Sequence, residues 1–171
     1  MRIKNNNYET RKLCKKIGRG DHLFVGIWHV RGTFEEGKLR HLVSEVGKYK
    51  FDIVGLQETK QSGHEVTEVG DYIFLNSGGE NRRLGMDFLI NRELKELILD
   101  FQPISERISL IRLRGKYQKI TVINIHAPTE EKEIEIKDQF YSELDRIYER
   151  IAKYDLKIII GDTNAKLGRE E

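Results

Sequence analysis

Short apolar runs and one amphipathic stretch alternate in the first part of the chain. The mostly apolar run at 23–30 is rich in β-forming residues and predicts a buried strand. Apolar residues then recur at helical spacing over 34–49, close behind a Thr-x-x-Glu pattern with the spacing of a capping box, and this combination predicts a helix. Residues 52–57 predict a second buried strand, and the polar, glycine-containing stretch 59–70 predicts a loop.

Strand-like patterns dominate the middle of the chain. Residues 72–76 and 86–90 predict two strands on either side of a turn-rich segment. Residues 107–113 alternate in polarity, and residues 119–125 return as another strand after a glycine. The last two segments together predict a β-hairpin.

The last third of the chain predicts one long helix and one strand. The helix extends over about 130–154, and its apolar face comprises Phe140, Leu144, Ile147, Tyr148 and Ile151. The strand covers 157–160, and a Gly-Asp-Thr-Asn sequence leaves its C-terminal end. Strands mixed with two helices and a hairpin indicate a layered α/β or α+β domain with a mixed sheet.

The composition fits one globular domain. Of the 171 residues, 38% are hydrophobic and 34% are charged, a mixture too apolar and too patterned for a disordered protein. No apolar run approaches the length of a membrane span, and no apolar core follows the polar N-terminus as it would in a signal peptide. Cys14 is the only cysteine, so we expect no intrachain disulfide and a reducing, intracellular compartment, with the nucleus compatible.

The net charge of +2 hides an asymmetry along the chain. Residues 1–22 carry seven basic and two acidic side chains, whereas residues 23–171 carry 23 basic and 26 acidic ones. We therefore divide the chain into a basic, flexible leader at 1–22 and a folded domain at 23–171. The leader has two interpretations: it contacts the phosphate backbone of nucleic acid, or it is a solvated tail.

Polar residues capable of chemistry follow four of the predicted strands. They are His29, Glu58, His126, Asp162 and Asn164. Strand ends in α/β sheets converge on a crevice where ligands bind, and buried strands do not need such groups at their ends for stability. The set as a whole therefore indicates a functional site, although no single member does.

Each of these residues also has a purely structural interpretation. Glu58 suits a Mg²⁺ site, because that cation prefers one or two carboxylates with water and substrate phosphate, but it also suits a surface or helix-capping role. Asp162 and Asn164 have the chemistry to orient an attacking water and to hold a phosphate oxygen, and equally the chemistry of a turn. His29 and His126 are candidate metal or phosphate contacts, or histidines satisfied within the core.

Six phrases of the sequence resemble the endonuclease/exonuclease/phosphatase superfamily, and most nearly the endonuclease domain of LINE-type retrotransposons. They lie at 26–31 (GIWHVR), 36–39 (EGKL), 52–59 (DIVGLQET), 105–108 (SERI), 123–130 (INIHAPTE) and 161–168 (GDTNAKLG). The resemblance covers the chain from about residue 23 to its C-terminus. Any one phrase is weak, but the ordered and spaced set is specific.

The resemblance implies a fold, an activity and a set of roles. The fold is a sandwich of two β-sheets packed face to face with helices outside. The activity is hydrolysis of phosphodiesters or phosphomonoesters with a divalent metal, Mg²⁺ or Mn²⁺, and the implied partner is nucleic acid, DNA rather than RNA. Glu58 corresponds to the principal metal ligand, with His29 beside it. Asp162 corresponds to the residue that positions or activates water, Asn164 to a phosphate hydrogen-bond donor and His126 to a phosphate contact.

The chain departs from the family pattern in three places. His29 replaces the usual asparagine, and histidine suits transition metals better than Mg²⁺. Asp87 stands where relatives have glycine and adds a negative charge to a strand. No histidine follows His126, so the downstream Asp-His signature of the family is absent. We therefore expect the N-terminal part of such a domain, apparently truncated at its C-terminus and inactive alone.

Two other functions stay open on the sequence. One is a non-catalytic remnant of the fold that binds nucleic acid or protein, which His29 and the absent signature favour. The other is a phosphatase acting on phosphorylated lipids or small molecules. The basic leader and the retrotransposon-like phrases argue against the phosphatase.

Overall fold

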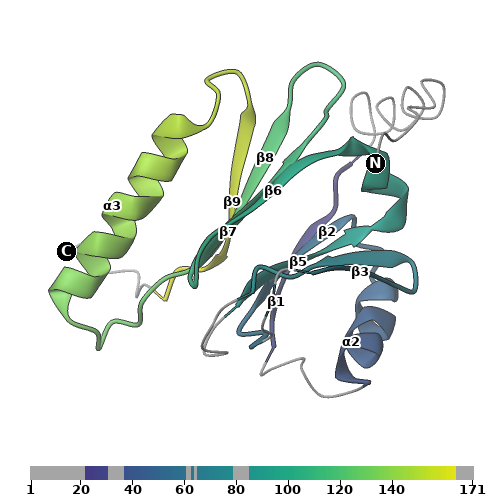
Figure 1. The fold of residues 1–171 in the computed structure, drawn as a ribbon, viewed down its shortest axis with the longest axis horizontal. Coiled ribbons are helices and arrows are strands. Elements are labelled where there is room, and N and C mark those ends of the chain that lie inside the picture. The colour runs from purple at the N-terminus through teal and green to yellow at the C-terminus, as the bar shows by residue number, and fades with distance from the viewer. Residues whose placement is uncertain (1–21, 31–36, 61–62, 64, 79–84, 165–171) are drawn as a thin grey trace, which may run out of the picture.

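Two β-sheets packed face to face form the centre of the molecule, and one helix covers the outer face of each. The computed structural model describes residues 22–30, 37–60, 63, 65–78 and 85–164. Figure 1 shows the order of the layers: helix α2 (Lys38–Gly47), the first sheet, the second sheet and helix α3 (Ile134–Arg150). This arrangement confirms the predicted α+β sandwich with mixed sheets flanked by helices. The predicted leader, apart from its last residue, lies outside the described residues.

The first sheet has five strands in the spatial order β1-β2-β5-β4-β3. Their bounds are β1 Val25–His29, β2 Ile53–Gln57, β3 Val66–Val69, β4 Tyr72–Leu75 and β5 Met86–Asn91. β1 and β2 are parallel, whereas the other neighbouring pairs are antiparallel. The parallel pair places His29 opposite Gln57, so both strands finish at the same edge of the sheet.

The second sheet has four strands in the order β6-β7-β8-β9. Their bounds are β6 Ile98–Ser105, β7 Ile108–Leu113, β8 Ile120–His126 and β9 Leu156–Asp162. A short 3-10 helix, η1 (Arg92–Leu97), connects the first sheet to the second. β7 and β8 form the predicted antiparallel hairpin, and β8 and β9 are parallel, with His126 opposite Asp162.

The hydrophobic pattern located most of these elements but missed two strands. β3 lies within the predicted loop at 59–70; it has only four residues, three of them exposed, so no buried face marks it. β6 was missed because it contains Pro103 and several exposed polar residues. Both are the outermost strands of their sheets, where proline and polar residues are tolerated because only one side of the strand is paired.

Both helices are shorter than the sequence predicts. α2 begins at Lys38, after Gly37 with φ of 90°, and the predicted capping pair lies outside the described residues. Residues 130–133, predicted as the start of the second helix, form a turn in which Lys132 N–H donates to the carbonyl of Thr129 at 3.0 Å. α3 ends at Arg150, before an extended Ile151. None of the described helices is long and apolar enough to cross a lipid bilayer.

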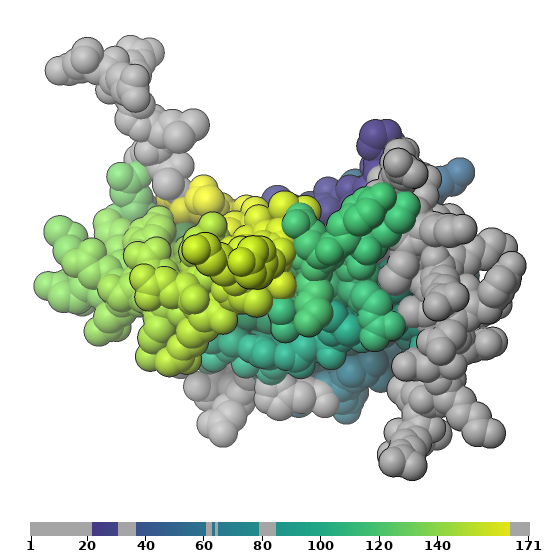
Figure 2. Space-filling model, turned by 90° about the horizontal axis from the view of Figure 1, so that it is seen from above, coloured from purple at the N-terminus to yellow at the C-terminus, as the bar shows by residue number. Residues whose placement is uncertain are grey.

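Three apolar clusters hold the four layers together. The central one lies between the sheets and uses alternate residues of β2, β4, β5, β7 and β8. α2 buries Leu42, Val43 and Val46 against the first sheet, and α3 buries Phe140 and Ile147 against the second. Each such side chain contributes about 1.5–3 kcal/mol on burial. The second sheet and α3, coloured green to yellow, make up most of the face seen from above (Figure 2).

A buried polar bridge interrupts the apolar interface between the sheets near the end of β8. The side chain of Asn124 is fully buried, and its Nδ2 donates to the carbonyl oxygens of Leu56 and Asp87, at 3.1 Å each. Its Oδ1 accepts from Gln57 Nε2 at 2.8 Å. Gly55 makes room for the amide, since a Cβ there would lie 2.8 Å from Asn124 Oδ1. One side chain of the second sheet therefore bonds three groups on two strands of the first.

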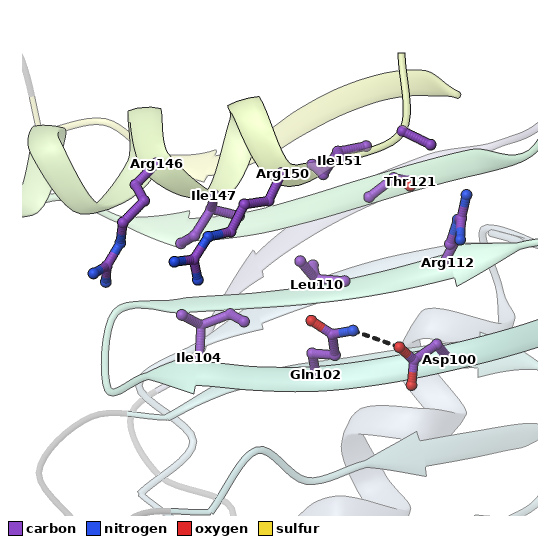
Figure 3. Close-up of a pocket in the computed structure, with 11 residues that line it drawn as sticks. Asp100, Gln102, Ile104, Leu110, Arg112, Thr121, Arg146, Ile147, Arg150 and Ile151 are labelled. Carbon is purple, nitrogen blue, oxygen red and sulfur yellow. Dashed lines mark hydrogen bonds between the residues drawn. The ribbon is translucent and has the colours of Figure 1, made fainter. Parts of the chain in front are cut away.

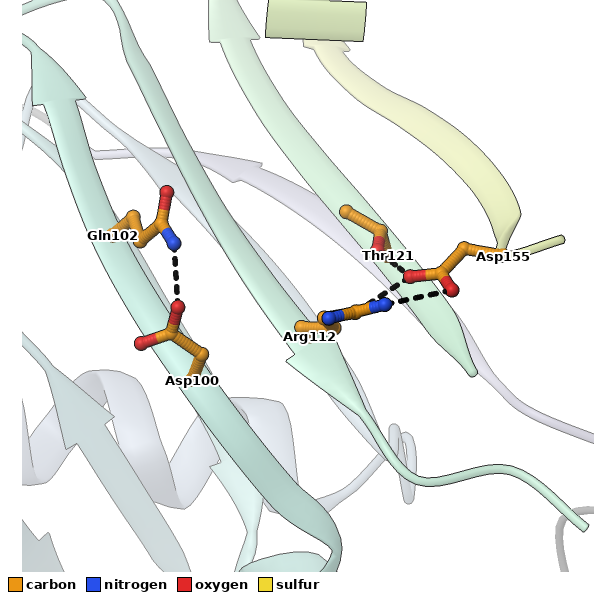
Figure 4. Close-up of polar contacts among 5 residues, drawn as sticks. All are labelled: Asp100, Gln102, Arg112, Thr121 and Asp155. Carbon is orange, nitrogen blue, oxygen red and sulfur yellow. Dashed lines mark hydrogen bonds and ion pairs between the residues drawn. The ribbon is translucent and has the colours of Figure 1, made fainter. Parts of the chain in front are cut away.

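A bidentate ion pair fixes the beginning of β9 on the outer side of the second sheet (Figure 4). Arg112 of β7 donates to Asp155 through Nε at 2.6 Å and Nη2 at 2.9 Å, and the Thr121 hydroxyl donates to the same carboxylate at 2.9 Å. The Asp155 side chain is only 4% exposed, and its hydrogen bonds with Arg112 hold its pKa below the usual value. The residue that precedes β9 is thereby tied to β7 and β8.

We expect Asn124→Ala to lower the free energy of unfolding by about 2–4 kcal/mol, because it leaves buried donors and acceptors unsatisfied on two strands. Urea denaturation followed by circular dichroism measures this loss. Ser109→Ala is the matched control, since Ser109 pairs with Asn124 across β7 and β8 and its buried hydroxyl has no hydrogen-bond partner among the described residues. A change below about 1 kcal/mol is expected for the control. Equal losses in the two variants would contradict the role of the amide.

Candidate cation-binding site

A parallel pair of strands in each sheet brings the predicted site residues to one edge of the sandwich. β1 and β2 finish side by side at His29 and Gln57, and β8 and β9 finish side by side at His126 and Asp162. β2 contacts both β8 and β9, which holds the two parallel pairs together. The carboxyl ends of four strands therefore meet at one place, the usual position of a ligand site in a sheet of this kind.

Three side chains at these strand ends form the His–Glu–His cluster: His29, Glu58 and His126. Each offers one ligand atom, and the three atoms lie within 4.8 Å of one another. His29 Nε2 is 3.5 Å from Glu58 Oε2, and the two imidazole rings meet edge to face with their centroids 5.7 Å apart. The side chains of His29 and Glu58 are 42% and 26% exposed, whereas His126 is 6% exposed. The cluster is thus open to solvent on one side and buried on the other.

Glu58 and Lys60 both adopt a left-handed backbone conformation immediately after β2, each with φ of 56°. This region is costly for residues other than glycine and is found where a side chain is held for function. Val30 N–H still donates to the carbonyl of Gln57 at 3.0 Å, so pairing with β1 continues to the last residue before the turn. Lys60 Nζ lies 4.0 Å from Glu58 Oε2, which places one cationic group beside the carboxylate.

His126 forms the buried side of the cluster. Burial lowers its pKa, and the nearby Arg107 lowers it further, while Glu58 and Asp162 act in the opposite direction. Arg107 Nη1 donates to the carbonyl of His126 at 3.0 Å, which accounts for its proximity. The Nδ1 atom of His126 has no hydrogen-bond partner among the described residues. A buried imidazole with an unpartnered nitrogen is chemically suited to a ligand at this position.

Asp162 and Asn164 lie beside the cluster and also form a turn. Asp162 Oδ1 accepts from the backbone N–H of Asn164 at 2.9 Å, as in an Asx-turn, and Asn164 has φ of 47°. Asn164 Nδ2 donates to the carbonyl of Ala127 at 2.6 Å. Strand pairing places Asp162 next to His126, whereas one N–H of the Asn164 side-chain amide is already donated to Ala127.

Four residues around the cluster were not singled out by the sequence: Gln57, Lys60, Arg107 and Asn124. Gln57 and Asn124 are polar residues inside strands predicted to be buried, and that conflict between polarity and burial was the available signal. Lys60 and Arg107 carried no local signal, because their positions depend on a turn and on a partner strand.

Asp87, the unexpected charge in β5, lies outside the cluster. It is fully buried, and its Oδ1 accepts from the backbone N–H of Ser77 at 2.7 Å and from the Ser77 hydroxyl at 2.9 Å. Burial raises its pKa, while hydrogen bonds from Thr59 and Ser77 lower it. The residue thus joins the end of β4 to β5 and does not add a carboxylate to the site.

A groove lies away from the cluster. It has a volume of about 200 Å³ and lies between α3 and the outer faces of β6 and β7. Its lining includes Ile104, Leu110 and Ile147, with Arg146 and Arg150 extending from the helix (Figure 3). The groove is on the α3 side of the second sheet, whereas Asn124 faces the first sheet, so it does not belong to the site.

The comparison with curated proteins finds a sequence relative. Craniofacial development protein 2 from Bos taurus is 32% identical over 148 residues, which are 86% of this chain and 25% of that protein. The chain therefore spans about a quarter of the length of the curated relatives it matches. No protein-family model matches the chain.

Two solved structures share the fold. A D. rerio TDP2 humanized by 14 mutations has a TM-score of 0.59 at 17% identity, over 82% of this chain and 61% of that one. The endonuclease domain of TRAS1, a telomere-specific non-LTR retrotransposon, has a TM-score of 0.54 at 16% identity, over 82% of this chain and 59% of that one. At these identities the structures establish the fold alone. Together with the sequence relative, they agree with the resemblance of the six phrases to the endonuclease/exonuclease/phosphatase superfamily.

We expect Asp87→Asn to become progressively more stable than the wild-type chain as pH rises. Because burial raises the pKa of Asp87 in the folded state, its contribution to stability is fully present below the unfolded-state value of about 4 and is lost as pH rises through the folded-state pKa. Urea denaturation between pH 4 and pH 8 measures the difference. Asp145→Asn, which removes an exposed carboxylate of α3, is the control and should show no such trend. A gap between Asp87→Asn and wild type that stays constant over this range would show that the carboxyl is not disfavoured by burial.

Proposed function

Because the chain belongs to the endonuclease/exonuclease/phosphatase superfamily, we propose that it supplies the cation site and the water-positioning group of a phosphodiesterase that acts on nucleic acid. The observation that supports this proposal is the meeting of His29, Glu58 and His126 at the same edge as Asp162. Such a set favours phosphodiester hydrolysis, because charge develops on the phosphate oxygens while a water attacks. DNA is proposed over RNA by analogy with D. rerio TDP2, a structure of the same fold that was solved in complex with a single-strand DNA product.

The donor set of the His–Glu–His cluster does not fit Mg²⁺, the ion first expected from the resemblance. Mg²⁺ prefers oxygen ligands and binds through one or two carboxylates, whereas two of the three donors here are imidazoles. Mn²⁺, the other expected ion, likewise favours oxygen donors. A bound divalent cation would supply Lewis-acid stabilisation of the phosphate. The roles proposed below for other residues do not depend on which ion is bound.

In this proposal Asp162 holds the attacking water. It lies opposite His126 at the end of the β8–β9 pair, next to the cluster. One of its oxygens accepts from Asn164 N–H at 2.9 Å, and a carboxylate has further lone pairs that can accept a hydrogen bond from water. The turn that contains Asn164 therefore orients Asp162 while leaving it able to act as a base.

In the proposal two donors bind phosphate oxygens. Lys60 brings a positive charge to within 4.0 Å of Glu58, and its side chain is 37% exposed. Asn164 uses one N–H for Ala127, and a side-chain amide has a second to donate. In the proposal Lys60 attracts the phosphate by charge, and Asn164 contributes a directed hydrogen bond.

The chain is expected to be inactive alone, so the assay uses it extended by the C-terminal half of a relative's endonuclease domain. In that protein Glu58→Gln should slow nicking of supercoiled plasmid DNA by about 100-fold or more, because it removes the one anionic donor of the cluster. The assay follows conversion to the nicked circle with Mg²⁺, Mn²⁺, Co²⁺ or Zn²⁺ as the added ion. Glu45→Gln is the matched control: Glu45 is a surface residue of α2 paired with Lys48, and its loss should leave the rate unchanged. The proposal fails if the extended protein with wild-type Glu58 nicks with none of these ions, or if its Glu58→Gln variant nicks as fast as Glu45→Gln.

A further inference from the structure

We propose that the His–Glu–His cluster is a transition-metal site that selects Zn²⁺ over Mg²⁺. This inference deepens the proposed function, because it names the class of cation bound by the same cluster. It rests on that function only for what the bound ion does to a substrate. Binding itself depends on His29, Glu58 and His126.

The chemistry of the donors favours a transition metal. Two donor atoms are imidazole nitrogens and one is a carboxylate oxygen. Imidazole binds Zn²⁺, Fe²⁺, Ni²⁺ and Cu²⁺ well, whereas Mg²⁺ keeps most of its water and takes oxygen ligands. Two histidines and one glutamate are also a protein ligand set of catalytic zinc sites, in which a further position stays open. The set here therefore corresponds to a site that can bind both a metal and a substrate.

The geometry is close to what such an ion requires. Ligand atoms at 2.0–2.1 Å from a tetrahedral Zn²⁺ lie about 3.4 Å from one another. His29 Nε2 and Glu58 Oε2 are already 3.5 Å apart, and all three ligand atoms lie within 4.8 Å. His29 and Glu58 are partly exposed, so their side chains have room to close on an ion held against the buried His126.

The charge around the cluster penalises Mg²⁺ more than Zn²⁺. Glu58 contributes the one negative charge of the donor set, and Lys60 Nζ lies 4.0 Å from its Oε2. A hard cation held mainly by attraction to carboxylates loses much of that attraction beside an ammonium group. Coordination by the nitrogens of His29 and His126 depends less on net charge. Lys60 and the two histidines thus both favour binding of Zn²⁺ over Mg²⁺.

The experiment measures Co²⁺ as a spectroscopic substitute for Zn²⁺, in a Cys14→Ser background because a thiolate binds both ions itself. We expect visible absorption from about one equivalent of bound Co²⁺, displaced by stoichiometric Zn²⁺ and retained in about 100-fold excess Mg²⁺. His29→Asn, Glu58→Gln and His126→Gln should each weaken binding by at least about tenfold. Circular dichroism establishes that each variant is folded. His29 is the most exposed of the three, so its variant keeps the test valid even if His126→Gln unfolds.

His41→Asn serves as the matched control, because it removes an exposed imidazole of α2 and should leave Co²⁺ binding unchanged. Displacement of Co²⁺ by equimolar Mg²⁺, or undiminished binding in folded His29→Asn, would overturn the inference. Failure of plasmid nicking together with the expected Co²⁺ behaviour would remove the proposed hydrolysis but leave the metal assignment in place. Nicking supported by Mg²⁺ in a His29→Asn variant that binds Co²⁺ like wild type would remove the metal assignment but leave the proposed hydrolysis in place.

Discussion

The buried amide of Asn124 is the interaction on which the functional edge of this molecule depends. Apolar contacts hold the two sheets together, but they are not directional and do not by themselves fix how one sheet sits on the other. The amide does, because it bonds two backbone carbonyls and one side chain of the first sheet in a dry environment where a misplaced partner is costly. Gly55 contributes to the same bridge, since any larger residue would occupy the space of the amide.

The position of each site residue follows from this bridge. Gln57, which donates to Asn124, is the residue before Glu58, and His126 lies two residues after Asn124 and so on the same side of β8. His29 is brought in by the pairing of β1 with β2, and Asp162 by the pairing of β9 with β8. Four segments far apart in the sequence therefore meet through the two parallel strand pairs and the amide bridge between the sheets. This is why the stability of the sandwich and the geometry of the site are coupled.

The sequence could predict elements and residues whose pattern is local. Buried strands and the two helices have periodic apolar positions, whereas β3 and β6 are paired on one side and have no such period. The polar strand ends could be identified because polar groups there are not required for folding. The convergence of these strand ends was predicted, but not that the ligand atoms of His29, Glu58 and His126 lie within 4.8 Å of one another, because those distances are set by the stacking of one sheet on another. The roles of Asp162 and Asn164 in catalysis stay predictions.

The most direct test of this view is a crystal structure of the chain grown with Zn²⁺, with anomalous scattering recorded on both sides of the zinc absorption edge. We predict one strong anomalous peak bonded to His29, Glu58 and His126 at about 2.0–2.2 Å, with Asn124 still bonded to both strands of the first sheet. A strong peak at other residues, with these three side chains unbonded and no closer to one another than now, would contradict the assignment of a cation site to this edge of the sandwich.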